Sequence, residues 1–295
     1  IAAETRDDKQ FVHFFPGLAT DSGTIQILEE SLADPVEHVP LTFANFGEGP
    51  TVDLSTGGEQ DQLIYHGTEG MDAFLVEETG GAFFFSPSVS LGEHVTISPD
   101  ASVELYRLLG FAGDDTFTFG NVDEGFPPPD DVRVEVDGGG PAGSDTVIYN
   151  SEGETTVDLG SAEITDDGVD GSPNVIFSAV ELIDVRAHDE NLIVQGTEED
   201  DIMQVIPLGA NSGRVETDGE FPAVVFEDVE AFTVDPLGAD DTVTVMGNSV
   251  DNTISIDRSA PSVQVDSRQI VDIDGANTEA IVVDGRAGDD TITVS

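Results

Sequence analysis

The chain has 295 residues, enough for one large β domain or two smaller ones, and its 38% apolar content supports a buried core. Lys and Arg number 9 against 61 Asp and Glu, which gives a formal net charge of −52. This charge excludes nucleic acid as a partner, because phosphates need a basic footprint, and it disfavours an anionic membrane surface. Like charges at this density repel one another, so salt or bound cations must screen them.

Cysteine is absent, which excludes disulfides and thiol chemistry. No apolar stretch approaches the ~20 residues that cross a bilayer, so we expect no membrane insertion. Repeat-like strands without cysteine and with excess acid are typical of an extracellular or cell-surface protein. A halophilic surface is a rival explanation of the charge, because salt shortens the screening length to roughly 3 Å at 1 M.

The first part of the chain, residues 1–126, is predicted to be a Phe-rich β region that holds 13 of the 17 Phe. Residues 31–37 and 101–109 are each expected to form one helical turn, and the rest reads as short strands between Gly, Pro, Asp and Asn. The runs Phe14-Phe15 and Phe83-Phe84-Phe85 cannot all face inward on one strand. They predict either a thicker core or an exposed contact surface.

One strand signature recurs along the whole chain: an acid or amide followed by alternating apolar residues. Since side chains two apart share a face of a strand, each copy is expected to send two apolar side chains inward. The copies begin at Asp61, Asp72, Asp115, Asp145, Asp201, Asp241, Asn252 and Asp290.

A larger unit pairs two such strands 11 residues apart around a glycine, as in Asp61 and Asp72 around Gly67. Internal similarity of this kind predicts an all-β fold built as a β-solenoid or β-helix-like repeat stack. Tandem antiparallel β-sandwich domains are the alternative, with a boundary near Pro127 to Asp131. Residues 127–295 would then form an acidic β-repeat region. Because the chain starts at Ile1 and a new copy begins just before its last residue, we interpret it as a piece of a longer repeat protein.

Glycines precede the repeated acid at fixed offsets, five and two residues before Asp72, Asp115, Asp145 and Asp290. Glycine permits a left-handed turn, which points carbonyl oxygens into a small space. A carboxylate at the start of the next strand can complete an oxygen cage for Ca²⁺, which takes six to eight oxygens. The doubled acids, such as Asp114-Asp115, favour calcium, because a turn needs only one.

This Gly-x-x-Gly-x-Asp-x-apolar pattern resembles a degenerate form of the RTX, or haemolysin-type, calcium-binding repeat of large bacterial surface and secreted proteins. The resemblance implies a parallel β-roll with Ca²⁺ between successive turns. Here the copies are isolated rather than tandem, so the acids could instead only cap turns through local backbone N–H groups. The candidate calcium ligands are Asp72, Asp114, Asp115, Asp145, Asp200, Asp201, Asp240, Asp241, Asp289 and Asp290.

Catalytic motifs are missing. None of the five histidines lies in a His-Glu-x-x-His arrangement, and there is no Gly-x-Ser-x-Gly elbow. We therefore predict no enzymatic activity. The leading expectation is an extracellular structural protein of a surface layer, filament or adhesive matrix, stabilised by calcium or salt, that self-associates. The alternatives are a calcium-dependent adhesin or carbohydrate-binding module, whose partners would be surface proteins or glycans, and a domain of a secreted polysaccharide-degrading enzyme.

Overall fold

The computed structural model describes residues 10–17, 22–29, 36–37, 40–43, 51–54, 61–79, 82–87, 96–99, 103–120, 133–140, 144–166, 175–219 and 221–295. The described residues form strands, turns and bends without a helix, so the all-β prediction is confirmed. They divide into two compact units, Ile1–Ile148 with Asp170–Val180 and Tyr149–Val169 with Glu181–Ser295. The segment expected to hold a domain boundary, residues 127–131, lies outside the described part.

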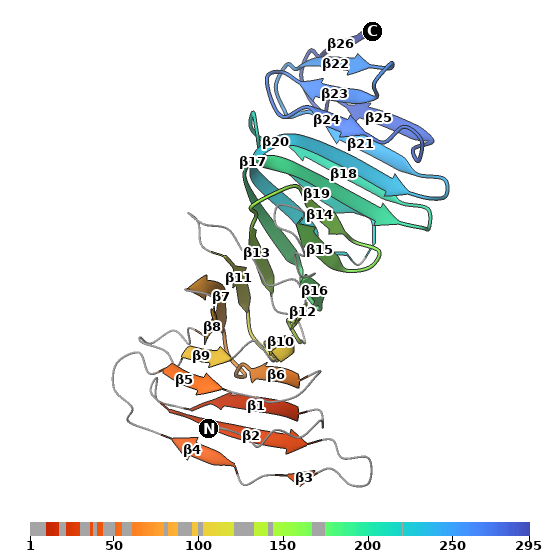
Figure 1. Ribbon diagram of the computed structural model, residues 1–295. Helices are drawn as coiled ribbons and strands as arrows, with labels where there is room; N and C mark the ends of the chain where they lie inside the picture. Colours follow the sequence, from red (N-terminus) through yellow and green to blue (C-terminus); the bar gives the residue numbers. More distant parts are fainter. Residues whose placement is uncertain are drawn as a thin grey trace. The chain divides into compact units, whose positions relative to one another are not determined.

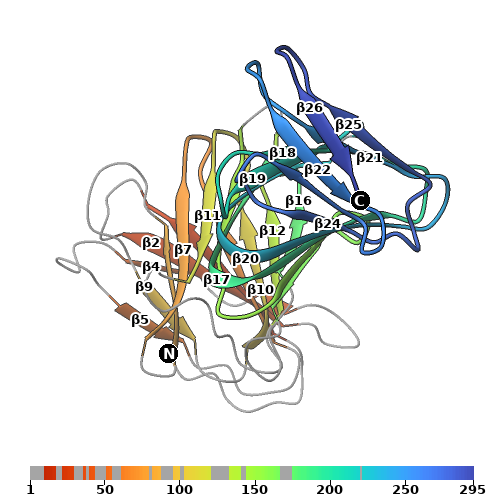
Figure 2. The same cartoon turned by 90° about the horizontal axis from the view of Figure 1, so that it is seen from above.

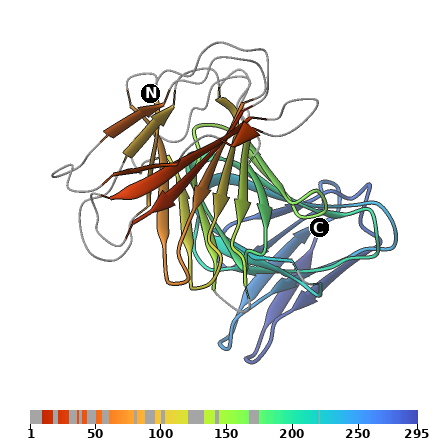
Figure 3. The same cartoon turned by 90° about the horizontal axis from the view of Figure 1, so that it is seen from below.

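Strands of the first unit stack in parallel and in register, which is the arrangement of a β-solenoid (Figure 1). One column runs β1, β6, β10, β12, β16, and β7 pairs with β11 in a second (Figure 3). The antiparallel strand β2 covers the far edge of β1. The strands are β1 Gln10–Pro16, β2 Gly23–Glu29, β3 Val36–Glu37, β4 Leu41–Phe43, β5 Thr51–Leu54, β6 Asp61–His66, β7 Ala73–Thr79, β8 Ala82–Pro87, β9 Thr96–Pro99, β10 Val103–Leu109, β11 Thr116–Phe119, β12 Arg133–Asp137 and β16 Val175–Ser178, with β13 Thr146–Asn150 at the division between the units.

The second unit repeats this plan in three parallel columns, β14–β17–β20–β24, β18–β21–β25 and β22–β26 (Figure 2). Antiparallel hairpins such as β18–β19 and β22–β23 leave the coil and return to it. These parallel ladders confirm the solenoid rather than tandem sandwiches. The strands are β14 Thr155–Asp158, β15 Glu163–Asp166, β17 Leu182–Thr197, β18 Ile202–Pro207, β19 Gly213–Thr217, β20 Ala223–Leu237, β21 Thr242–Met246, β22 Thr253–Asp257, β23 Ser262–Val265, β24 Val271–Ile273, β25 Ala280–Asp284 and β26 Thr291–Val294.

The period-two pattern explains the core. Phe117 and Phe119 of β11 are fully buried, as are Val243 and Val245 of β21, whereas the Thr residues between them lie on the outer side. Each such side chain contributes about 1.5–3 kcal/mol when it leaves water. The two inward apolar positions predicted for each copy are therefore confirmed, except in β22, where Ile254 is buried but Ile256 is only partly buried, and in β26, where both are exposed.

The helical turn expected over residues 101–109 is wrong, because Val103–Leu109 is strand β10. β10 lies between β6 and β12, and hydrogen bonds to both neighbours override a weak local helix preference. Tyr106 and Leu108 thereby enter the core. Of the other expected helical turn, Val36–Glu37 is strand β3, and residues 31–35 lie outside the described part. Phe14 is buried and Phe15 is partly exposed, while the side chains of Phe83, Phe84 and Phe85 lie outside the described part.

Candidate functional site: the acidic turns

Acids that begin the strands of the coils are buried, although carboxylates rarely leave water without partners. The residues of this inner row are Asp61, Asp72, Asp115, Asp145, Asp201, Asp241 and Asn252, and each is at most 5% exposed. Each one is the first residue of a strand of the stack or directly precedes one.

The inner acids join coil to coil. The Asp72 backbone N–H donates to Asp115 Oδ1 at 2.7 Å, and the Asp115 N–H donates in turn to Asp145 Oδ1 at 2.7 Å. In the second unit the Asp201 N–H donates to Asp241 Oδ1 at 2.8 Å. Hydrogen bonds to a charged acceptor are about twice as strong as neutral ones, so this row stabilises the stacking of successive coils.

At Asp114, Asp200 and Asp251, an outer acid that directly precedes the inner residue accepts the reverse bond. The Asp240 N–H donates to Asp200 Oδ1 at 3.1 Å, and the Asp289 N–H donates to Asp251 Oδ1 at 2.8 Å. The Ser144 backbone N–H donates likewise to Asp114 Oδ1 at 3.1 Å. Two neighbouring coils thus exchange a pair of hydrogen bonds, which we call the acid clasp. The carboxylates of Asp114 and Asp200 therefore join neighbouring coils through these hydrogen bonds.

The clasps occur in two forms that differ in the residue four before the inner acid. In the capped form, the backbone N–H of this residue donates to Oδ2 of the inner acid. The N···O distance is 2.6 Å both from Thr68 to Asp72 and from Thr197 to Asp201. The threonine hydroxyls add a second contact at 3.1 Å. Both oxygens of Asp72 thereby accept hydrogen bonds from its own turn, and Asp201 Oδ2 accepts two.

In the uncapped form, the corresponding residue has a positive φ and its N–H points elsewhere. Phe111, four residues before Asp115, has φ 73°, and Leu237, four residues before Asp241, also has φ 73°. Leu237 donates its N–H to Asp235 rather than to Asp241. The Oδ2 atoms of Asp115 and Asp241 are consequently buried without a hydrogen-bond partner, as is Asp61 Oδ2.

An ionised carboxylate oxygen in this position is costly, and the acid resists ionisation. Burial raises the pKa of Asp115 to about 6, with the neighbouring Asp72 and Asp145 charges adding to the rise. Burial also raises the pKa of Asp241. The pKa of Asp72 is raised by burial too, but hydrogen bonds from Thr68 oppose that rise. The uncapped turns therefore concentrate unbalanced negative charge inside the fold.

The first glycine of each turn is required by close approach rather than by its φ angle. A Cβ on Gly67 would lie 2.7 Å from Asp72 Oδ2, and one on Gly196 would lie 2.6 Å from Asp201 Oδ2. The second glycine adopts the expected left-handed backbone at Gly113 and Gly288, with φ +139° and +133°, but not at Gly70. Before Asp145, Gly138 takes the first position rather than Gly140, and Gly143 lies outside the described part.

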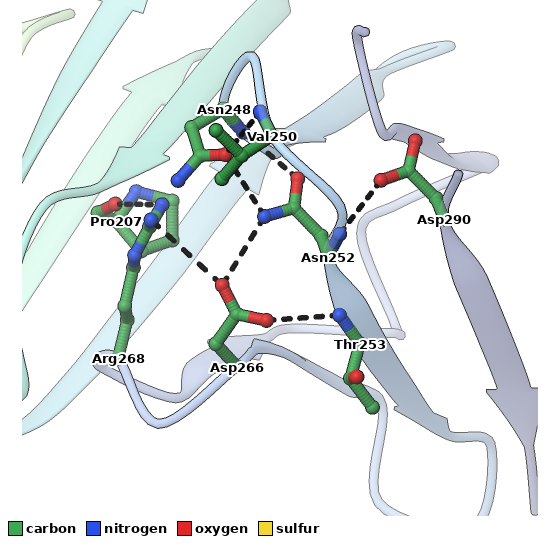
Figure 4. Close-up of polar contacts among 8 residues, drawn as sticks. All are labelled: Pro207, Asn248, Val250, Asn252, Thr253, Asp266, Arg268 and Asp290. Carbon is green, nitrogen blue, oxygen red and sulfur yellow. Dashed lines mark hydrogen bonds and ion pairs between the residues drawn. The ribbon is translucent and has the colours of Figure 1, made fainter. Parts of the chain in front are cut away.

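One clasp uses an amide. Asn252 accepts the Asn248 N–H at 3.0 Å and donates from Nδ2 to Asn248 Oδ1 and to Asp266 Oδ2, at 3.0 and 3.1 Å (Figure 4). Its own N–H donates to Asp290 Oδ1 at 2.8 Å. Arg268 Nη2 lies 3.8 Å from Asp266 Oδ2, so the two side chains form an ion pair. An aspartate at this position would face the Asp266 carboxylate, and the amide provides a donor instead.

The ten candidate calcium ligands occupy three neighbourhoods: Asp72, Asp114, Asp115 and Asp145; Asp200, Asp201, Asp240 and Asp241; and Asp289 with Asp290. The described residues contain no group of three or more His, Asp or Glu side chains arranged to hold a metal ion. The structure adds Asp61, Asp251, Asn252 and the capping residues Thr68 and Thr197 to the acidic turns. The Gly-Thr pairs five and four residues before Asp72 and Asp201 were the sequence signal that could have identified capping.

A second cluster involves histidine. His13 Nδ1 lies 2.9 Å from His66 Nε2, and the His66 ring stacks between Phe15 and Phe111 at 4.2 and 5.6 Å. Burial lowers the pKa of His66 to about 4, with the His13 charge adding to the shift. The ring centroids of the two histidines lie 5.2 Å apart, with the ring planes inclined by 27°. This cluster is an aromatic column across neighbouring coils held by a neutral hydrogen bond.

Comparison with known proteins gives no relative: no family model, curated protein or solved structure matches this chain. The residues that the structure describes include no helix long and apolar enough to cross a membrane.

Proposed function

We propose that this protein is an extracellular structural protein, a subunit of a surface layer, filament or adhesive matrix, that self-associates and is stabilised by calcium or salt. The observation that carries the proposal is the acid clasp, which recurs at Asp114-Asp115, Asp200-Asp201 and Asp251-Asn252. The acids of these turns are used to stack coils, a structural task, and they leave the fold dependent on screening.

Cation dependence follows from the uncapped turns. The unpartnered oxygens of Asp115 and Asp241 supply buried negative charge, and turn carbonyls such as Gly138 O lie near the Asp115 carboxylate. Oxygen ligands of this kind suit Ca²⁺, with Asp114 and Asp240 next in sequence to the two inner acids. Concentrated salt would act on the same charge by screening.

The few basic residues also support a structural role. Arg107 Nε lies 2.8 Å from Glu135 Oε2 of the next coil, and Arg186 Nε lies 3.5 Å from Glu227 Oε1 of the following coil. Surface pairs of this kind are worth only about 0–1 kcal/mol each. They occupy arginines that an enzyme acting on acidic polysaccharides would need for its substrate.

The test is the particle size of the purified chain in calcium, in EDTA, and in EDTA with about 1 M NaCl, measured by light scattering. We expect large particles in calcium or salt and small ones in EDTA at low ionic strength. A chain that stays monomeric in every buffer but is retained on glycan or cell-wall matrices would favour the binding-module alternative and contradict self-association.

A further inference from the structure

Two histidines meet where the first two stacked strands of the first unit lie side by side (Figure 1). His13 of β1 is opposite Ile64 of β6, so His66 comes two residues further along the same face of the neighbouring strand. His13 Nδ1 lies 2.9 Å from His66 Nε2. Both residues are partly exposed, so solvent reaches these two side chains, which we call the histidine pair.

The hydrogen bond within the histidine pair leaves another nitrogen unsatisfied. A neutral imidazole carries one N–H and one lone pair. If His66 Nε2 accepts the bond, the His66 proton is on Nδ1, and if Nε2 donates the bond, Nδ1 holds the lone pair. In either case His66 Nδ1 is buried without a hydrogen-bond partner. An unpaired buried nitrogen offsets the gain from the bond, so an ion that replaces the bond sacrifices little stability.

The separation of the two facing nitrogens matches a pair of ligands on one metal ion. Imidazole nitrogens bind divalent transition metals at about 2.0–2.1 Å. Two such ligands at a right angle are about 2.9 Å apart, whereas the tetrahedral angle preferred by zinc separates them by about 3.3–3.4 Å. The observed 2.9 Å therefore fits adjacent positions of a square-planar or tetragonal ion, which is the geometry of Cu²⁺ and Ni²⁺. Of these two ions Cu²⁺ binds nitrogen sites more tightly.

The surroundings prepare the histidine pair for a cation. The His66 ring stacks between Phe15 and Phe111, with centroid distances of 4.2 and 5.6 Å, so its position is ordered before an ion arrives. Burial lowers the pKa of both histidines, that of His66 to about 4, and neutral rings keep their lone pairs available at neutral pH. The formal charge of −52 raises the concentration of cations near the chain.

We propose that His13 Nδ1 and His66 Nε2 bind a single Cu²⁺ ion, with water at its remaining positions. The described residues bring no third His, Asp or Glu to this place, so the two nitrogens are the protein's ligands. Both rings turn until their lone pairs converge on the ion, and the His66 proton is then on Nδ1. Because the ligands come from β1 and β6, the ion joins two successive coils. The site uses nitrogen rather than the carboxylates of the acidic turns, and it goes beyond the proposed function.

Copper titration followed by electron paramagnetic resonance tests the site directly. The purified chain, without an affinity tag, is titrated with Cu²⁺ at about pH 7 in excess calcium, which competes for the carboxylate oxygens. We expect a single tight site whose spectrum shows coupling to two nitrogens. Since the ion binds the folded chain and joins two coils, Cu²⁺ should also raise the melting temperature.

Matched variants assign the two nitrogens. His13→Gln and His66→Phe should each weaken the site about tenfold or more and remove one nitrogen from the spectrum. His66→Phe keeps a ring between Phe15 and Phe111, and circular dichroism in metal-free buffer checks that the variant folds. His188→Gln, in the second unit, is the control and should leave copper affinity and nitrogen coupling unchanged.

A wild-type spectrum with fewer than two nitrogens would overturn the proposal. So would equal losses of affinity in His13→Gln and His188→Gln, or a folded His66→Phe variant that binds Cu²⁺ as tightly as the wild type. The nitrogen count is measured on the unaltered chain, so the proposal is decided even where a variant fails to fold.

Discussion

The turns that end in Asp201 and Asp241 lie in neighbouring coils of the same unit and share one clasp, yet they treat the inner carboxylate differently. Asp201 receives the N–H and the hydroxyl of Thr197, whereas the second oxygen of Asp241 is buried without a partner. The difference arises four residues earlier, where Leu237 adopts a positive φ and donates its N–H to Asp235. One backbone angle thus decides whether the second oxygen of a buried carboxylate accepts hydrogen bonds from its own turn or is left without a partner.

The largest expected effect comes from filling the space under an inner carboxylate. Gly110→Ala should lower the free energy of unfolding by about 3 kcal/mol, because the new Cβ would lie 2.7 Å from Gly138 O and collide with the Asp115 carboxylate. Chemical denaturation measures this. Gly70→Ala is the control: its Cβ would meet only Thr68 Oγ1 at 3.7 Å, and a similar loss there would contradict the close-approach explanation.

A smaller loss is expected when the amide clasp becomes acidic. Asn252→Asp should destabilise the fold by about 2 kcal/mol, because it places a carboxylate against Asp266 and Asn248 Oδ1 and removes two donated hydrogen bonds. Adding Asp266→Asn should restore part of the stability in a double-mutant cycle. A fully additive cycle would show that the two side chains are not coupled.

Removing a capping hydroxyl tests the capped form. Thr197→Val keeps the backbone N–H bond to Asp201 but loses the hydroxyl contacts to Asp201 and Glu199, so unfolding free energy should fall by about 1 kcal/mol. Thr244→Val on the outer side of β21 should change it by less than about 0.5 kcal/mol. Equal losses in urea melts would mean that the hydroxyl does not cap the turn.

In the uncapped form, removing the charge of the inner acid should raise the free energy of unfolding rather than lower it. Since the pKa of Asp115 is raised to about 6 from its ordinary value of 3.8, the folded chain binds this proton more tightly than the unfolded chain. Stability in EDTA should therefore increase as pH falls from about 7 toward 4. Asp115→Asn should flatten this slope and, at pH 7, change stability by under about 1 kcal/mol in the favourable direction.

The control for this pH measurement is Asp114→Asn, which removes an exposed charge from the same turn and keeps an acceptor for Ser144. Its pH profile should follow the wild type between pH 4 and 7. If Asp115→Asn and Asp114→Asn flatten the profile equally, total charge rather than the buried oxygen sets the pH dependence.

The sequence supported much of the fold but less of the site. Alternation in segments such as residues 115–119 and 241–245 predicted buried pairs, because strand geometry makes side-chain direction a local property. It could not predict that Asp72 bonds Asp115 across 43 residues, since that contact depends on how coils stack. Likewise, the positive φ of Phe111 and Leu237 is set by the turn and not by residue type, so the sequence signals only the capped turns, through Thr68 and Thr197.

The most direct test is thermal melting of the wild type and the Asp115→Asn/Asp241→Asn double variant in EDTA, in calcium, and in EDTA with about 1 M NaCl. If the uncapped acids make the fold depend on cations, calcium or salt should raise the wild-type melting temperature, and most of that increase should be absent in the double variant. An equal increase in both proteins, or a wild type indifferent to EDTA at low salt, would contradict the account.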